Sequence, residues 1–309
     1  MISKLRMIVQ FFSFAVLNYG GRIGINLGFS LPCFACPFVS GCGGYCFLFY
    51  LQRVGLFGAA NWSQIFTYPG LKTILWFILF AVLVMLLSKT WCGWICPFGT
   101  MQDWLTMLRK KLGIREIEWS WKTYDTIKPL KYLFLGVILV VPLLIAYGGM
   151  HQDFYLLFCR ICPGRTLLPL FAGQTRFFSL DFANDITLVI SVISIIIAAI
   201  TVVGSFFKER FFCLFCPMLP LIQMFKKYSL ITFEKKVDTC SGCGNCLRMC
   251  PMDVREVHEE KEKAKVMSPE CLLCMKCVES CPEDKTLTIK FLQYKIFTSS
   301  REYITKNFK

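Results

Sequence analysis

The sequence predicts a membrane-embedded, all-α part with an internal parallel repeat, followed by a small cytoplasmic α+β domain. The 309-residue chain has a mean hydropathy of +0.54 and only 17% charged residues, which is too apolar for a soluble enzyme. Cysteine-proline patterns recur in both halves of the apolar part, and a longer cysteine motif occurs twice after them. The expected division is a first membrane repeat at 1–115, a second at 116–227, the small domain at 228–295 and a tail at 296–309.

Four apolar segments are long enough to cross a bilayer. The first is kept as a membrane anchor because it is long and lacks the small-residue cleavage site of a signal peptide. The expected spans are residues 7–29, 71–88, 130–148 and 186–207.

The distribution of charge predicts the topology. Residues 1–227 contain 20 Lys and Arg against 8 Asp and Glu, so most of the net charge of +14 lies in the membrane part. The basic residues cluster before the first span, between the second and third, and after the fourth. By the positive-inside rule, both termini face the cytoplasm in a multi-pass inner-membrane protein. The basic residues form no aromatic-laced stripe, so nucleic-acid binding is not expected.

Each half of the membrane part repeats the order span, cysteine pair with proline, span, cysteine pair with proline. The offset is 126 residues from Cys33 to Cys159 and 121 residues from Cys92 to Cys213. Corresponding pairs fall on the same side of the membrane, so the halves are parallel repeats about an axis along the membrane normal. Two thiolates from each half supply the four ligands that an iron–sulfur cluster needs. The expected inner set, near the cytoplasmic face, is Cys92, Cys96, Cys213 and Cys216.

The cysteines on the outer side leave alternatives open. They either hold a further cluster, form disulfides or pack as small apolar side chains. Cys42 and Cys46 have no counterpart in the second half; they are alternative ligands, a disulfide pair or the site of an additional bound group. Since the hydrocarbon core is about 30 Å thick, inner and outer clusters are linked only if the cysteine loops dip inward or another cofactor lies between them. The expected outer set is Cys33, Cys36, Cys159 and Cys162.

The small domain contains the run C-x2-C-x2-C-x3-C-P twice, beginning at Cys240 and at Cys271. In two-cluster ferredoxins the fourth cysteine of each run ligates the other cluster. Zinc ribbons need two separated ligand pairs, and a disulfide framework has no reason to repeat this spacing. We therefore expect two 4Fe–4S clusters in a bacterial-type ferredoxin domain. The ligands of cluster 1 are Cys240, Cys243, Cys246 and Cys281, and those of cluster 2 are Cys271, Cys274, Cys277 and Cys250.

The remaining elements are expected as follows. The ferredoxin domain has strands near 230–234, 264–267 and 287–291. The apolar stretches 47–50 and 167–171 are candidates for re-entrant segments inside the membrane part. His151 is a candidate proton acceptor for quinol oxidation, although a plain loop histidine is the commoner reading. The tryptophans beside the inner cysteines, Trp91, Trp94 and Trp104, are expected to form an interfacial belt.

The stretch "TWCGWICPFGTMQDW", followed by a further span, a second C-P motif and the tandem ferredoxin runs, resembles the polytopic membrane ferredoxins of the NapH, NosR and CcoG type. The resemblance covers most of the chain and supports the eight ferredoxin cysteines and the inner set. The chain differs in having C-x2-C-P as its last membrane motif and six cysteines on the outer side.

The resemblance implies an electron-transfer component of an oxidoreductase system, such as a quinol dehydrogenase subunit in anaerobic respiration. Electrons would pass between the ferredoxin domain and one or two membrane clusters, with quinone or an extracytoplasmic redox partner at the other end. A larger complex and a cytoplasmic donor or acceptor are expected partners. The alternative is an assembly or metal-reducing factor of the CcoG type, serving a metalloenzyme.

Overall fold

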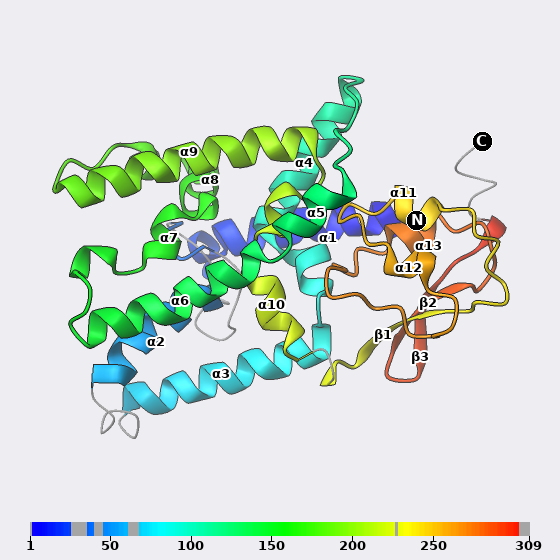
Figure 1. Ribbon diagram of the computed structural model, residues 1–309, viewed down its shortest axis with the longest axis horizontal. Helices are drawn as coiled ribbons and strands as arrows, with labels where there is room; N and C mark the ends of the chain where they lie inside the picture. Colours follow the sequence, from blue (N-terminus) through cyan, green and yellow to red (C-terminus); the bar gives the residue numbers. More distant parts are fainter. Residues whose placement is uncertain (1, 26–35, 40–45, 61–67, 226–227, 303–309) are drawn as a thin grey trace.

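The computed structural model describes residues 2–25, 36–39, 46–60, 68–225 and 228–302. Long helices run side by side, and a small sheet with its loops lies at one end of them (Figure 1). The α1 helix starts at this end, where the Ser3 N–H donates to Glu279 Oε2 at 2.9 Å. The long helices are α1 (Ile2–Tyr19), α3 (Tyr68–Leu87), α6 (Leu130–Ala146) and α9 (Asp185–Phe207).

The long helices expose apolar side chains on their outer faces. Examples are Phe12 on α1, Leu75 on α3 and Leu133 on α6, each more than 60% exposed. Among the described residues, two stretches are long and apolar enough to cross a membrane: Trp121–Ala146 and Asp185–Phe207. The described structure is therefore helical, with two apolar helices of spanning length and a small sheet.

Shorter helices fill the interior and line the end next to the C-terminal domain (Figure 1). The stretches expected to be re-entrant are helical: 47–50 begins α2 (Phe47–Ala60), which packs on α6, and 167–171 ends α8 (Pro163–Phe171), which packs on α9. The other short helices are η1 (Gly20–Ile23), η4 (Trp91–Ile95), α4 (Pro97–Lys111), α5 (Trp121–Ile127), η5 (Gln152–Phe154), α7 (Leu157–Ile161), η6 (Arg176–Phe178), η7 (Phe211–Leu214) and α10 (Met218–Gln223).

The C-terminal domain contains a three-stranded antiparallel sheet in the order β1-β2-β3. The expected strand at 264–267 is reduced to one bridge between Glu234 and Lys265, whereas the last strand was missed. Apolar side chains on β1 and β2, such as Phe233 and Ile289, are 1% exposed and form the core with the cysteine loops. The elements are β1 (Ile231–Lys235), α11 (Asn245–Arg248), α12 (Glu256–Glu259), α13 (Lys276–Glu279), β2 (Leu287–Phe291) and β3 (Tyr294–Thr298).

Candidate cluster-binding sites

The eight ferredoxin cysteines gather around two cavities of the C-terminal domain. The structure brings the residues of each run together with the fourth cysteine of the other run, and Cys246 borders both cavities. The first cavity contains Cys240, Cys243, Cys246 and Cys281, and the second contains Cys250, Cys271, Cys274 and Cys277.

The loops around these cavities direct backbone N–H groups at sulfur. Gly242 and Gly244 have φ of 69° and 73°, a conformation that glycine adopts without strain. The Val254 N–H donates to Cys250 Sγ at 3.3 Å and the Leu273 N–H to Cys271 Sγ at 3.4 Å. Burial, and then the neighbouring Cys274, raises the pKa of the Cys271 thiol to about 11, so iron has to displace its proton on binding.

A third cavity, of about 120 Å³, lies inside the membrane part. Its lining includes cysteines from both the expected inner and the expected outer set, so these two groups are not separated by the thickness of a bilayer. Cys33 and Cys42 lie outside the described residues. The described cysteines around the cavity are Cys36, Cys46, Cys92, Cys96, Cys159, Cys162, Cys213 and Cys216.

Several of these cysteines stand at the start of a helix. Cys96 and Cys162 are the N-cap residues of α4 and α8, and the following prolines occupy the first helical turn. The Cys46 carbonyl likewise accepts the first-turn N–H of Phe49 at 3.1 Å. Unpaired N–H groups and the helix dipole favour negative charge at this position, and proline is well tolerated just after it. The C-P pattern therefore places a cysteine at the amino end of a helix.

Two buried glutamines donate to cysteine sulfur in the membrane cavity. Gln52 Nε2 lies 3.0 Å from Cys159 Sγ, and Gln102 Nε2 lies 3.8 Å from Cys213 Sγ.

The cysteines of the described residues are all free thiols, so none of them forms a disulfide with another. Within the same residues, no group of three cysteine, histidine or acidic side chains is close enough to hold a single metal ion.

The ferredoxin domain touches the membrane part at the loop of cluster 2. Leu272 lines both the cluster 2 cavity and the membrane cavity. A Cβ on Gly93 would lie 2.5 Å from the Leu272 carbonyl oxygen, so the two backbones meet where only glycine fits. The Trp94 indole donates to the Leu273 carbonyl at 3.0 Å.

The expected interfacial belt of tryptophans is wrong for Trp91 and Trp94. Their exposed fractions are 7% and 6%, so both side chains lie in the interior.

A buried guanidinium holds the inner cysteine loop in place. Arg210 is 2% exposed; its Nη1 donates to the Cys92 carbonyl at 2.8 Å, and its Nε donates to Asp103 Oδ1 at the same distance. Gln10 on α1 also donates to Asp103, at 2.7 Å. Arg210 stands three residues before Cys213, as Lys89 does before Cys92, so each repeat has a buried cation at this position.

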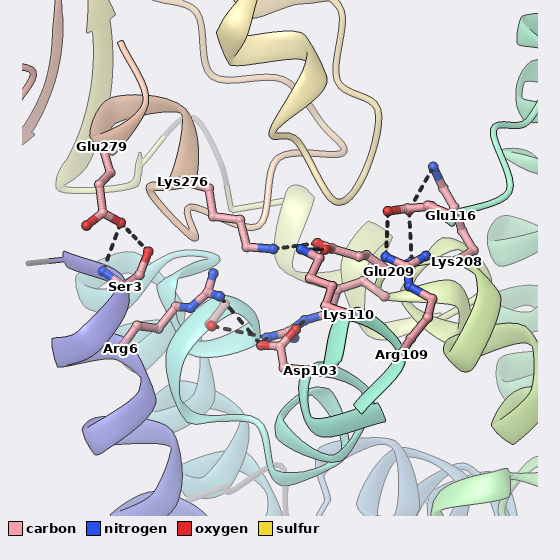
Figure 2. A network of polar contacts seen from close by, with 12 residues as sticks. Ser3, Arg6, Asp103, Arg109, Lys110, Glu116, Lys208, Glu209, Lys276 and Glu279 are labelled. Atoms are coloured by element: carbon pink, nitrogen blue, oxygen red, sulfur yellow. Dashed lines mark hydrogen bonds and ion pairs between the residues drawn. The ribbon is translucent and has the colours of Figure 1, made fainter. Parts of the chain in front are cut away.

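A second group of ion pairs ties the C-terminal domain to the ends of α4 and α9. Glu209 lies between Lys110 on α4, at 2.5 Å, and Lys276 on α13 (Figure 2). Lys208 reaches Asp253 of the ferredoxin domain at 2.5 Å. Since Glu209 is 5% exposed, its charge depends on these partners for stabilisation.

We expect this interface to stay closed between pH 8 and pH 5. Burial acts to raise the pKa of Asp103 and Glu209, but Arg210 and Lys276, respectively, outweigh it and bring each to about 2. Because the folded pKa lies below the ordinary value, the stabilisation is complete above about pH 4.5 and is lost as the pH falls towards 2. Hydrogen exchange of α13 should therefore show constant protection from pH 8 to pH 5, after correction for intrinsic rates; opening within that window would contradict the assignment.

His151 lies away from the cavity lining. Its side chain is 68% exposed and contacts Asp153 at 2.9 Å in the loop after α6.

The sequence did not predict the roles of Gln52, Gln102 and Arg210. Of these, only Arg210 gave a signal, because it shares its position in the repeat with Lys89.

Comparisons with known proteins give matches to two families of iron–sulfur domains. A 4Fe-4S binding domain matches residues 70–115 and 190–234, which contain the inner cysteine pairs, and a 4Fe-4S dicluster domain matches residues 233–282. No solved structure matches the chain.

Three relatives illustrate the similarity. The putative electron transport protein YccM of Escherichia coli strain K12 is 26% identical over 68% of this chain. The ferredoxin-type protein NapH of Haemophilus influenzae is 28% identical over 63% of this chain, and the regulatory protein NosR of Pseudomonas aeruginosa is 23% identical over 72%. The aligned region spans 54%, 60% and 27% of these relatives' own lengths.

Proposed function

We propose that this chain, which belongs to the NapH/NosR-like family of 4Fe-4S ferredoxin-type proteins, relays electrons between the cytoplasm and a redox site inside the membrane. It is an electron-transfer iron–sulfur protein; the route and partners are the proposal. The bound clusters supply one-electron chemistry, while the chain sets their order and surroundings.

One observation carries the proposed route: Leu272 lies between the cluster 2 cavity and the membrane cavity. The residue belongs to the loop of Cys271 and Cys274, and its side chain is 2% exposed. Cys243 of the cluster 1 set, in contrast, is exposed, so a soluble partner can approach it. We therefore place cluster 1 at the cytoplasmic entrance, cluster 2 next to the membrane part, and a further cluster on Cys92, Cys96, Cys213 and Cys216.

The chain would hold this route across the membrane with four spans, α1, α3, α6 and α9. Their outward apolar side chains support contact with lipid, and the cations Lys110 and Lys208 at the domain end support a cytoplasmic location for that end. Both the start of α1 and the ferredoxin domain lie at this end (Figure 1). The chain would act as a subunit of a larger complex, with quinone or an extracytoplasmic protein as the second redox partner.

The proposal is tested by electron transfer in sealed liposomes. A membrane-impermeant reductant is added outside and an impermeant oxidant is enclosed, so that only chains with the ferredoxin domain outside are reduced. The wild-type protein should reduce either the enclosed oxidant or added menaquinone, and Cys271→Ser should slow the transfer at least tenfold because it removes a cluster 2 ligand. If neither acceptor is reduced, the relay is wrong.

The same assay separates a second function. A chain that reduced copper(II) or iron(III) ions on the cytoplasmic side, but neither quinone nor the enclosed oxidant, would be a metal-reducing or assembly factor. The proposed relay predicts the opposite preference, because the buried Leu272 contact leads from cluster 2 inward rather than to the aqueous surface.

A further inference from the structure

We propose that Cys36, Cys46, Cys159 and Cys162 form a second cluster site in the membrane part, sharing one cavity with the inner cysteines. This inference deepens the proposed relay and rests on it only for its role in electron transfer; cluster binding is tested separately. The assignment places Cys46, rather than Cys33, in the ligand set.

Three separate segments bring these four thiols to one cavity. Cys36 lies in the described segment 36–39, Cys46 immediately precedes α2, Cys159 lies within α7 and Cys162 is the N-cap of α8. Such convergence differs from isolated buried cysteines, because helices of both repeats must end or start at the same point to produce it. Four thiols are the ligand number of a 4Fe–4S or 2Fe–2S cluster.

The polar groups around these thiols fit an anionic group. Gln52 is 2% exposed, and its amide donates to Cys159 Sγ at 3.0 Å. Cys46 and Cys162 stand at the amino ends of helices of 14 and 9 residues, where backbone N–H groups favour negative charge. Hydrogen bonds from N–H groups to cluster sulfur are one of the means by which proteins set cluster potential.

Arg165 supplies an independent observation. It lines the cavity, its guanidinium lies 5.0 Å from the ring centroids of Phe38 and Phe177, and its buried Nε has no hydrogen-bond partner among the described residues. A buried donor without a partner is costly, so its presence beside four thiols points to an acceptor in the cavity. A cluster held by four thiolates carries negative charge and sulfur acceptors, which suit this donor.

The rest of the lining excludes water from the site. Phe38, Leu48, Phe158 and Leu168 border the same cavity. The four cysteines lie outside the stretches that match the 4Fe-4S domains, 70–115, 190–234 and 233–282. Since the second site opens into the cavity of the inner set, the two membrane clusters would be neighbours, and no additional cofactor is needed between them.

The test is the iron and acid-labile sulfide content of anaerobically purified full-length variants. Cys46→Ser and Cys159→Ser are expected to lose about four iron atoms each if the site holds a 4Fe–4S cluster, or about two for a 2Fe–2S cluster. Cys33→Ser is the matched control and should keep the wild-type content. In all three variants, the EPR signals of the reduced ferredoxin clusters should remain, which shows that the chain has folded.

Wild-type iron content in Cys46→Ser, or loss of iron in Cys33→Ser instead, would overturn the assignment. A failure of the relay is distinguishable, since it would abolish electron transfer without changing these iron counts. Should the cysteine variants not fold, Arg165→Gln gives a second test. It should retain all iron and lower the midpoint potential of one membrane cluster, because a cation favours the more negative, reduced state; unchanged potentials would contradict the site.

Discussion

Arg210→Met is expected to lower the free energy of unfolding by about 3–5 kcal/mol and to release the inner membrane cluster, because it leaves Asp103 buried without its main partner. Arg210 is 2% exposed and joins the Asp103 carboxylate to the Cys92 carbonyl. Removing it both uncovers a buried charge and frees the loop that positions two cluster ligands. Thermal unfolding and iron content report the two effects separately.

The double variant Asp103→Leu with Arg210→Met distinguishes charge from packing. A buried ion pair replaced by apolar residues is often tolerated, so this variant should recover part of the stability lost in Arg210→Met. Arg176→Met removes an arginine from the exposed η6 turn and serves as the control, with a change within about 0.5 kcal/mol. A double variant less stable than Arg210→Met would show that the uncompensated carboxylate is not the cause.

Gly93→Ala is expected to weaken the docking of the ferredoxin domain by about 1–3 kcal/mol, the usual cost of overpacking. The new methyl group would lie 2.5 Å from the Leu272 carbonyl oxygen and 3.2 Å from Cys274 Cα, and neither backbone atom can turn away as a side chain can. To relieve this overlap, the loop of cluster 2 has to move away from the membrane cavity. Electron transfer from the ferredoxin clusters to the membrane clusters should slow, with iron content unchanged.

The matched control is Gly136→Ala on α6, where an added Cβ meets no atom within 4 Å. Alanine is a better helix former than glycine, so this variant should be as stable as the wild type or slightly more stable. Rapid mixing with a reductant, followed by freeze-quench EPR, measures the transfer step. If Gly93→Ala transferred electrons at the wild-type rate, Leu272 would not mark the route between the two parts.

The local sequence predicted the ferredoxin elements well and the depth of the membrane loops poorly. The expected strand at 287–291 has the same bounds as β2, because the alternation of apolar residues within one strand is a local signal. The prediction of a strand at 264–267 was wrong, because this segment pairs with β1 only through the bridge from Lys265 to Glu234. Trp94 was wrongly expected at a lipid interface. Its hydrogen bond to the Leu273 carbonyl depends on a tertiary contact that the sequence does not show.

The membrane cavity depends on tertiary packing that spacing does not encode. The repeat predicted that Cys92 and Cys213 correspond, but whether Cys36 and Cys162 lie at an outer face or dip inward depends on how α2 and α8 pack against α6 and α9. Gln52 and Gln102 read as ordinary polar residues, and only the fold directs their amides at cysteine sulfur.

The most direct test of the central claim, a chain of clusters from the ferredoxin domain into the membrane, is an iron and acid-labile sulfide count on the anaerobically purified wild-type protein. We expect about sixteen iron atoms if all four sites hold 4Fe–4S clusters. EPR of the fully reduced sample should then show signals of the membrane clusters in addition to those of a ferredoxin lacking the membrane part. About eight iron atoms, with ferredoxin signals alone, would contradict the proposed chain of clusters, because the cysteines of the membrane cavity would then bind no cluster.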